Sequence, residues 1–297
     1  MRSEPSRLVR LAPSLVLGAL IGATLLAACA TPEGLPPLTA RPSSEWHPGK
    51  FVWFDLLSEN PAAARSFYSE VFGWRFDAFG ADGDDAYYLI RNGDVVIGGL
   101  ARLDGDDADV PQSLWLPTLS VEDVDAAAAL AKGSGGQVLR QPEDFPGRGR
   151  IAAVRDPNGA TLLLLRSDDG DPPDRAAPVG AWLWTDLWTP DAAEAKGFYA
   201  ALAGFEARDI EASKEHVYHV FGRDGRARAG MVELLEQRVD PNWLPYVRVA
   251  DVDETVRRAE AHGGRVLLRS ADVAVLMDPA GAAVGVQRHR RLAEATR

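Results

Sequence analysis

The chain has 297 residues, of which 46% are hydrophobic and 25% are charged, a composition typical of a globular protein long enough for two domains. Its formal net charge of −11 argues against a nucleic-acid partner, because binding to nucleic acid requires a basic surface. The acidic runs at 82–85, 104–109 and 168–174 lack the spaced glycine and distal glutamate of a calcium-binding loop, so we interpret them as solvated loops and a linker.

Residues 1–29 have the pattern of a bacterial lipoprotein signal peptide. Three arginines near the start precede an almost unbroken apolar run over 11–28, which ends in Leu-Ala-Ala-Cys at Cys29. Signals that this segment resembles are cut before the cysteine, which is then lipidated, so the segment is left out of the fold. Cys29 is the only cysteine in the chain, and no intramolecular disulfide can form. An uncleaved membrane anchor and an ordinary signal peptide are the alternatives.

The lipoprotein interpretation predicts a protein held in the bacterial cell envelope by its N-terminal lipid. By the same resemblance, Ala30 after the cysteine favours the outer membrane, with the protein facing the periplasm. Residues 30–49 contain several prolines and are predicted to form a tether that holds the globular part off the membrane.

The globular part is predicted to begin with a strand and a helix. Residues 51–57 (FVWFDLL) are apolar or aromatic on both faces, which is consistent with a strand that a helix covers on one side. The helix is predicted from Pro61, with Asn60 as its N-cap, and Gly73 ends it. Strands with an Asn-Gly hairpin turn at 92–93 follow.

The second half of this unit repeats the same order of elements. A strand at 115–121 precedes a helix at 124–132, and a last hairpin turns at 156–159. Each half is therefore predicted to be a β-α-β-β-β module.

The remainder of the chain is a second copy of this unit. Three sets of residues recur. Trp53, Asp55 and Phe67-Tyr68 correspond to Trp184, Asp186 and Phe198-Tyr199, each 131 residues later. Trp115 corresponds to Trp243 at an offset of 128, and Asp156 corresponds to Asp278 at an offset of 122. Because the offset falls only between blocks, we interpret the chain as a tandem duplication in which connecting loops became shorter.

The predicted fold class is α+β, with four βαβββ modules forming two domains that have cupped mixed β-sheets. We place the first domain at 50–167, an acidic linker with prolines at 168–179, the second domain at 180–290 and a tail at 291–297.

The order of these blocks resembles the vicinal oxygen chelate superfamily, which contains glyoxalase I, extradiol dioxygenases and the fosfomycin and bleomycin resistance proteins. The resemblance covers residues 50–290 and implies the fold, but one scaffold of this kind supports unrelated chemistries. In the metal enzymes of the family, side chains from the first and last strands of each module bind a divalent metal on the floor of the cup.

The resemblance implies which residues would take the metal-ligand positions here. They are Trp53, Gly98, Leu116 and Leu163 in the first unit, and Trp184, Ala229, Leu244 and Gly285 in the second. None of these side chains can bind a metal, and residues 50–167 contain no histidine. His216 and His219 are three residues apart on a predicted strand, so they point to opposite faces and cannot chelate together. We therefore expect no metal and no other cofactor.

Strand alternation predicts which side chains face the two cups instead. The tryptophan and the aspartate on the first strand of each unit are predicted to point into the cup. The mid-unit and fourth strands are predicted to add charged or polar side chains, and His219 is the candidate on the third strand. The candidate set is Trp53, Asp55 and Arg102 in the first cup and Trp184, Asp186, His219, Glu233, Tyr246 and Arg248 in the second. These groups either orient a flat or cationic ligand on the tryptophan, or simply fill the cup and pair with one another.

Two loops are expected to distinguish the cups. Residues 144–150 (DFPGRGR) are predicted to be a mobile loop over the first cup, and the shorter counterpart at 269–274 is predicted to leave the second cup more open. The leading hypothesis is a membrane-tethered protein that binds a small molecule without a metal, in the manner of the bleomycin resistance proteins. The alternatives are a glyoxalase- or dioxygenase-type enzyme with an atypical site in the second domain, and a structural interaction module of the envelope. Pairing of the two domains within one chain makes a monomer a plausible state.

Overall fold

A computed structural model of the chain describes residues 35–80, 86–103, 113–211, 217–234 and 240–289. The first unit consists of β1 (Phe51–Ser58), α2 (Pro61–Phe72), β2 (Arg75–Phe79), β3 (Tyr87–Asn92), β4 (Val95–Arg102), β5 (Ser113–Ser120), α3 (Val124–Gly133), β6 (Gln137–Phe145), β7 (Gly149–Arg155) and β8 (Thr161–Ser167). The second consists of β9 (Trp182–Thr189), α4 (Ala192–Ala203), β10 (Glu206–Glu211), β11 (Val217–Arg223), β12 (Arg226–Glu233), β13 (Asn242–Arg248), α5 (Val252–Ala261), β14 (Arg265–Arg269), β15 (Val273–Met277) and β16 (Ala283–Gln287).

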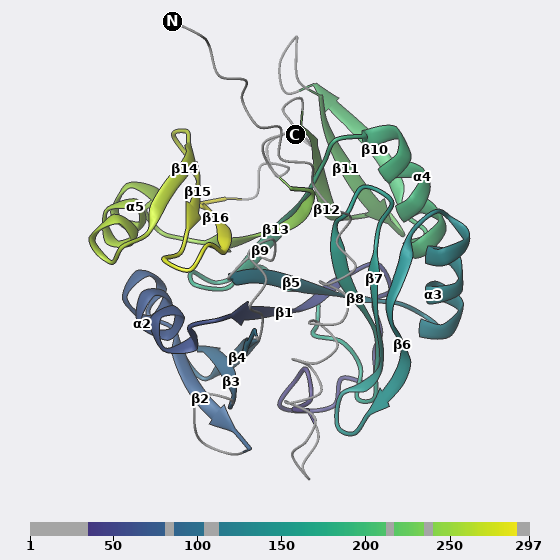
Figure 1. Cartoon of the computed structure of the whole chain (residues 1–297), viewed down its shortest axis with the longest axis horizontal. Coiled ribbons are helices and arrows are strands. Elements are labelled where there is room, and N and C mark those ends of the chain that lie inside the picture. The colour runs from purple at the N-terminus through teal and green to yellow at the C-terminus, as the bar shows by residue number, and fades with distance from the viewer. Residues whose placement is uncertain (1–34, 81–85, 104–112, 212–216, 235–239, 290–297) are drawn as a thin grey trace, which may run out of the picture.

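Each unit forms its own eight-stranded mixed sheet (Figure 1). The strand order is β2-β3-β4-β1-β5-β8-β7-β6 in the first sheet and β10-β11-β12-β9-β13-β16-β15-β14 in the second. In both sheets the first strands of the two modules pair antiparallel at the centre, and each also has a parallel neighbour from its own module. The predicted α+β fold with four βαβββ modules is thereby confirmed.

The helix boundaries follow the local sequence signals. The side chain of Asn60 accepts a hydrogen bond from the backbone N–H of Ala63 at 3.0 Å, and Pro61 occupies the first turn of α2. Gly73 ends α2 in the left-handed conformation, with φ of 73°, which costs glycine least.

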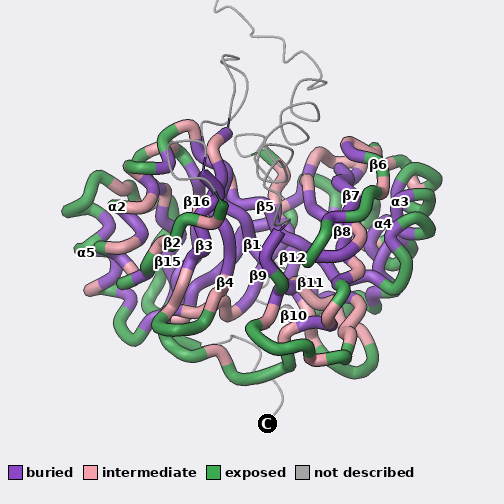
Figure 2. The backbone as a smooth tube through the Cα atoms, turned by 90° about the horizontal axis from the view of Figure 1, so that it is seen from below, coloured by how far each residue is buried: buried purple, intermediate pink, exposed green. Residues whose placement is uncertain are grey.

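The helices of the two units pair with one another rather than within their own unit (Figures 1 and 2). Helix α2 lies beside α5, and α3 lies beside α4, so the two pairs form opposite ends of the molecule with the strands between them. Each helix pair covers one hydrophobic core built from both units. The helix-facing side of each sheet therefore packs in a core that both units form, whereas the concave side of each sheet is lined by residues of one unit.

Two buried hydrogen-bond networks join the units within these shared cores. Tyr68 on α2 donates to Asp278 of the second unit at 3.3 Å and accepts from the Trp115 indole at 3.0 Å. At the other end, the corresponding network joins Tyr199, Asp156 and Trp243, with distances of 3.0 and 2.9 Å. The repeated sequence blocks thus meet across the boundary between the units.

The segment before β1 packs onto the first unit instead of extending from it. We call residues 35–49 the N-terminal strap. The backbone N–H of Leu35 donates to Pro146 O at 3.0 Å, and the Trp46 indole donates to Ser167 O at 2.9 Å. This docked segment differs from the free tether expected over 30–49, whose first residues lie outside the described part of the chain. Among the described residues, no helix has the length and apolar character needed to cross a membrane.

Candidate ligand-binding site

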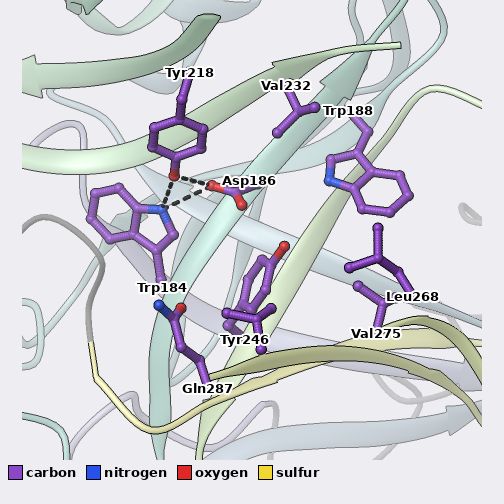
Figure 3. Close-up of a pocket in the computed structure, with 10 residues that line it drawn as sticks. Trp184, Asp186, Trp188, Tyr218, Val232, Tyr246, Leu268, Val275 and Gln287 are labelled. Atoms are coloured by element: carbon purple, nitrogen blue, oxygen red, sulfur yellow. Dashed lines mark hydrogen bonds between the residues drawn. The ribbon is translucent and has the colours of Figure 1, made fainter. Parts of the chain in front are cut away.

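Each cup contains the same three hydrogen-bonded side chains on its floor, which we call the Trp–Asp–Tyr triad. In the second cup, Trp184 and Asp186 lie two residues apart on β9 and so face the same side, and Tyr218 reaches them from β11 (Figure 3). The Trp184 indole N–H donates to Asp186 Oδ1 at 2.9 Å and to Tyr218 Oη at 2.8 Å. The Tyr218 hydroxyl donates to the same Asp186 oxygen at 2.6 Å.

The first cup repeats this geometry closely. Trp53 Nε1 donates to Asp55 Oδ1 at 3.0 Å and to Tyr87 Oη at 3.2 Å, and Tyr87 Oη donates to Asp55 Oδ1 at 2.6 Å. The two tyrosines stand 131 residues apart, like the two tryptophans and the two aspartates. The duplication therefore preserved the whole triad.

Burial determines the protonation of these groups. Burial raises the pKa of the Asp55 carboxyl, and the positive charge of Arg148 and the hydrogen bonds from Tyr87 and Trp53 act against that shift. Burial, together with the adjacent carboxylate, raises the pKa of both Tyr87 and Tyr218. Both phenols therefore keep their protons at neutral pH and act as hydrogen-bond donors to the aspartates.

The first cup is filled by the protein's own side chains. Leu35 and Leu38 of the strap are each 5% exposed and lie in one apolar cluster with Trp53, Phe145 and other cup residues. Arg148, between β6 and β7, is 4% exposed, and its guanidinium carbon lies 4.1 Å from the centre of the Trp53 ring. The loop expected to be mobile over this cup thus contributes buried side chains to it.

The second cup contains a cavity of about 190 Å³ (Figure 3). Its aromatic and polar lining is Trp184, Asp186, Trp188, Tyr218, Tyr246 and Gln287, and its aliphatic lining is Val232, Leu268, Val273 and Val275. The residues that correspond in the first unit to Trp188, Tyr246 and Gln287 are smaller or apolar, namely Leu57, Thr118 and Leu165. The cavity is consistent with the expectation that the shorter loop leaves this cup more open.

One polar atom of the cavity lining stands out. The indole nitrogen of Trp188 is buried and makes no hydrogen bond with any residue that the structure describes. Trp188 follows Trp184 and Asp186 at the same two-residue spacing on β9, so its ring faces the same cup. A ligand with a hydrogen-bond acceptor would satisfy this donor.

The structure brings five of the predicted cup residues to the cups. Trp53 and Asp55 lie in the first, and Trp184, Asp186 and Tyr246 lie in the second. Sequence reasoning missed Tyr87, Tyr218, Trp188, Gln287 and Arg148. The recurrence of Tyr87 as Tyr218 at the same offset as the other triad members was a signal for two of them. Cys29 and His216 lie outside the described residues.

The predictions for Arg102 and Glu233 are wrong, because these side chains face the helices. On β4, Leu100 lies in the helix-side core and Ala101 in the cup, so alternation returns Arg102 to the helix side. Glu233 accepts a hydrogen bond from the backbone N–H of Ala192 at 3.2 Å, at the start of α4.

The physical reason is a β-bulge in each of these strands. The pairing of β3 with β4 shifts after Ile90, and the pairing of β11 with β12 shifts after Phe221. One extra residue in β4 and in β12 reverses the side to which the following residues point. The cup-facing positions are therefore Gly99 and Gly230, rather than the Gly98 and Ala229 of the sequence alignment.

The prediction for His219 is also wrong. His219 follows the cup-facing Tyr218, points to the opposite side of β11 and contacts Asp209 Oδ1 through Nδ1 at 2.7 Å.

Arg248 is the register partner of Gln287, so it lies on the cup side of β13 as predicted. Its guanidinium donates to the carbonyl oxygens of Ala177 at 2.6 Å and Arg288 at 3.3 Å, and Arg248 is not among the described residues that line the cavity.

The floor of the second cup does not fit a divalent metal. Its positions are occupied by Trp184, Gly230, Leu244 and Gly285, which offer no side-chain oxygen, thiolate or imidazole ligand. Within the described ranges, no group of three or more His, Cys, Asp and Glu side chains is arranged to hold a metal ion. Among the described residues, the polar groups that line this cup are one carboxylate, two phenols, two indoles and the carboxamide of Gln287.

Two tandem domains with cupped mixed sheets and an internal site in the cup define the class of this protein. A family model of the Glyoxalase/Bleomycin resistance protein/Dioxygenase superfamily matches residues 50–164, and a model of a glyoxalase-like domain matches residues 182–286. The chain belongs to this superfamily.

Two curated relatives resemble the chain over most of its length. The protein named "Putative glyoxylase CFP32" of Mycobacterium tuberculosis (strain CDC 1551 / Oshkosh) is 30% identical over 251 residues, which cover 82% of this chain and 96% of that protein. Anthracycline biosynthesis protein DnrV of Streptomyces peucetius is 30% identical over 258 residues, covering 80% and 93%.

Solved structures share the fold. The Mn(II)-bound glyoxalase from Novosphingobium aromaticivorans superposes with a TM-score of 0.55 at 15% identity, covering 80% of this chain and 81% of that one. The 2,3-dioxygenase LapB from Pseudomonas sp. KL28 also superposes with a TM-score of 0.55, at 13% identity, covering 80% and 91%.

Proposed function

We propose that the second cup binds a small, flat molecule without the help of a metal, in the sequestering manner of the bleomycin resistance proteins. The cavity beside the Trp–Asp–Tyr triad is the observation that carries this proposal. Small-molecule sites are typically concave and mostly apolar, with a few polar groups that orient the ligand. Here the aromatic rings of Trp184, Trp188 and Tyr246 offer stacking surfaces, and Asp186 provides the charged group.

The similarity to an anthracycline biosynthesis protein supports a flat ligand, because an anthracycline is itself built on a planar ring system. The cavity also weighs against the structural-module hypothesis, which expects both cups to be filled by side chains. Among the described residues, Leu35, Leu38 and Arg148 fill the first cup. The second cup contains the cavity.

The test is a binding screen with variants that convert the second cup toward the first. Trp188→Leu and Tyr246→Thr introduce the residues that the first unit has at these positions. For a flat aromatic ligand found in the screen, each variant is expected to weaken binding about tenfold by loss of ring stacking and buried area, measured by isothermal titration calorimetry. Trp46→Phe, on the strap, is the control and is expected to bind normally. Unchanged affinity in both cup variants contradicts the proposal.

We propose further that the protein performs this binding while held to the outer membrane by lipid on Cys29. The charged start, the apolar run and the Leu-Ala-Ala-Cys box support this part. The Cys29→Ser protein is expected to leave the membrane fraction of the producing bacterium and to lose incorporation of a labelled fatty acid. Membrane association and labelling that persist in this variant contradict the tethering.

A second candidate function is catalysis on the bound molecule. It is favoured by the similarity to a protein named as a glyoxylase and by the Asp186 carboxylate at the cavity, a candidate general base that the hydrogen bond from Tyr218 holds in place. Mass spectrometry of a bound ligand after incubation with the protein tests this function. A ligand that is altered by the wild-type protein and left intact by Asp186→Asn supports catalysis, and a ligand recovered unchanged in both contradicts it.

A further inference from the structure

The indole of Trp188 is a hydrogen-bond donor that the folded chain leaves unpaired. Its nitrogen is buried at the cavity of the second cup and has no hydrogen-bond partner among the described residues. In Figure 3 this nitrogen lies on the edge of the ring that faces the other lining residues. An indole N–H can only donate a hydrogen bond, and a buried donor without an acceptor is unfavourable. A molecule that enters the cavity gains most when it supplies the acceptor.

A second polar side chain lines the cavity at its opposite end. Gln287 on β16 is 4% exposed, and no hydrogen bond joins its carboxamide to the other residues that line the cavity (Figure 3). In the strand register, Trp188 is paired with Asn242, the first residue of β13, and Gln287 is paired with Arg248, the last. The two polar groups are therefore separated along the length of β13.

The first unit has leucines at both of these positions. Leu57 corresponds to Trp188 at the offset of 131, and Leu165 corresponds to Gln287 at the offset of 122. Both leucines are fully buried in the apolar cluster of the first cup. The sheet can therefore be built with apolar residues at these places. Polar groups that the fold does not need, and that the protein itself leaves unsatisfied, are expected where a side chain serves a ligand.

We propose that Trp188 determines which ligands the second cup binds, by donating a hydrogen bond to an uncharged acceptor, such as a carbonyl oxygen, on a flat molecule. This inference rests on the proposed binding function of the cavity and specifies the chemistry of its ligand. Val232, Leu268 and Val275 lie nearest Trp188 in the view of Figure 3. Beside such an apolar wall, an ion would lose far more hydration energy than a carbonyl group does.

The ligand class that follows is an aromatic ketone, lactone or quinone. Its ring fits the mostly apolar lining, and its carbonyl oxygen accepts from the Trp188 indole. A second polar substituent at the far end of the molecule would meet Gln287, whose carboxamide both donates and accepts hydrogen bonds.

The first experiment observes the hydrogen bond directly by nuclear magnetic resonance. The full chain is labelled with nitrogen-15 at its tryptophans, and Trp188→Phe identifies the Trp188 indole signal by its loss. The probes are 1-indanone and indane, which share one ring skeleton with and without the carbonyl group. Saturating 1-indanone is expected to shift the Trp188 indole proton downfield, as a new hydrogen bond does, and indane is expected to give no downfield shift. The Trp46 indole, which already donates to Ser167 O, is the internal control and is expected to keep its position.

The second experiment compares the affinities of the two probes, measured from the same titrations. In Trp188→Phe, 1-indanone is expected to lose about tenfold more affinity than indane, because the variant keeps an aromatic ring and lacks the donor. The comparison with indane removes the part of the loss that comes from the smaller ring. Trp46→Phe is the control variant and is expected to leave both affinities unchanged.

The outcomes separate this inference from the proposed function. Bound 1-indanone that leaves the Trp188 indole proton unshifted overturns the inference, and so do equal losses of the two probes in Trp188→Phe. In both cases the binding of a flat molecule by the second cup still stands. Absence of binding by both probes overturns the inference as well, and the proposed function is then decided by its own screen.

The third experiment tests the free protein for the role of Gln287. Gln287→Leu introduces the residue of the first unit and is expected to raise the melting temperature by about 2–4 °C, because an apolar side chain of similar size replaces a buried amide. Thr185→Val is the control, since the Thr185 hydroxyl donates to Leu244 O at 3.1 Å, and it is expected to lower the melting temperature. A melting temperature that falls in both variants would show that Gln287 serves the fold, and would overturn its role at the cavity.

Discussion

Gly230 lies on β12 directly beside the contact between Tyr218 and Asp186. It is the register partner of Asp186 on the neighbouring strand, and a Cβ atom at this position would overlap both Tyr218 Oη and Asp186 Oδ1. Gly99 has the same relation to Tyr87 and Asp55. Close approach of two polar side chains therefore requires glycine at both positions.

Gly230→Ala is expected to lower the free energy of unfolding by about 1–3 kcal/mol, because the new methyl group forces the tyrosine and the aspartate apart. Urea denaturation followed by tryptophan fluorescence measures this effect. Gly197→Ala is the control in the same unit, since nothing lies within 4 Å of its Cβ position on α4. That change is expected to be neutral or to stabilise by about 0.5–1 kcal/mol. Equal effects of the two substitutions contradict the close-approach argument.

Asp278 provides a prediction for the pH dependence of stability. Burial raises the pKa of its carboxyl above the usual value of 3.8, although backbone N–H groups and the Tyr68 hydroxyl act against the shift. The folded state therefore holds this proton more tightly than the unfolded state does. The resulting contribution to stability is fully present below pH 3.8 and is lost as the pH rises through the folded-state pKa.

Asp278→Asn removes this titration. The difference in free energy of unfolding, wild type minus variant, is expected to decrease as the pH rises from about 3 through the raised pKa, by about 1.4 kcal/mol for each unit of pKa shift. Urea titrations at half-unit pH intervals measure it, and other titrating groups cancel in the difference. A difference that increases with pH over this range would mean that Asp278 is stabilised as a carboxylate.

At the scale of elements, the N-terminal strap decides which cup is closed. Leu35 and Leu38 are buried against the same apolar cluster as Trp53, and the β6–β7 turn holds the strap by the bond from Leu35 N to Pro146 O. Gly147 in that turn has φ of 80°, and a Cβ there would overlap Leu35 O. Strap and turn therefore close the first cup together, and the second unit has a shorter turn over its cup.

Leu38→Asp is expected to release the strap, because a buried carboxylate without a partner is strongly unfavourable. Hydrogen exchange of the Leu35 amide is expected to become at least about tenfold faster, which corresponds to about 1.4 kcal/mol, while exchange in α3 and α4 stays unchanged. Pro37→Ala is the control, since Pro37 is exposed in the same segment. Unchanged protection of the Leu35 amide in Leu38→Asp would show that the strap is not held by its leucines.

At the scale of the whole molecule, the two units share their hydrophobic cores, and we expect them to unfold together. Each of the two large hydrophobic clusters draws its side chains from both units, and each contains a Trp–Tyr–Asp network that crosses between them. Each helix packs on strands of its own unit, but separation of the units would expose the part of each core that the other unit covers. Unfolding of one unit consequently exposes the core of its neighbour.

Tyr68→Phe tests this cooperativity. Loss of the hydroxyl leaves the buried Trp115 indole and the Asp278 carboxylate without this partner, at an expected cost of about 1–3 kcal/mol. Hydrogen exchange measured by mass spectrometry is expected to show the same loss of protection in β3 of the first unit and in β11 of the second. Two separate transitions, with only one affected by the substitution, would contradict the shared core.

The sequence by itself determined the architecture and part of the site. The duplicated blocks specify two units of two modules each, and simple alternation places Trp53, Asp55, Trp184, Asp186 and Tyr246 in the cups. These features are local, because strand alternation and helix caps depend on neighbouring residues along the chain.

Only the tertiary structure decided the rest. A single extra residue in β4 and in β12 turned Arg102 and Glu233 toward the helices, and such a bulge is defined by the pairing with a neighbouring strand. The position of Arg148 over Trp53, the strap in the first cup and the cavity in the second depend on contacts between segments far apart in sequence. Hydrophobic burial and hydrogen-bond partners at such separations leave no periodic signal in the chain, so only the folded structure shows which side chains fill the first cup and where the cavity of the second cup lies.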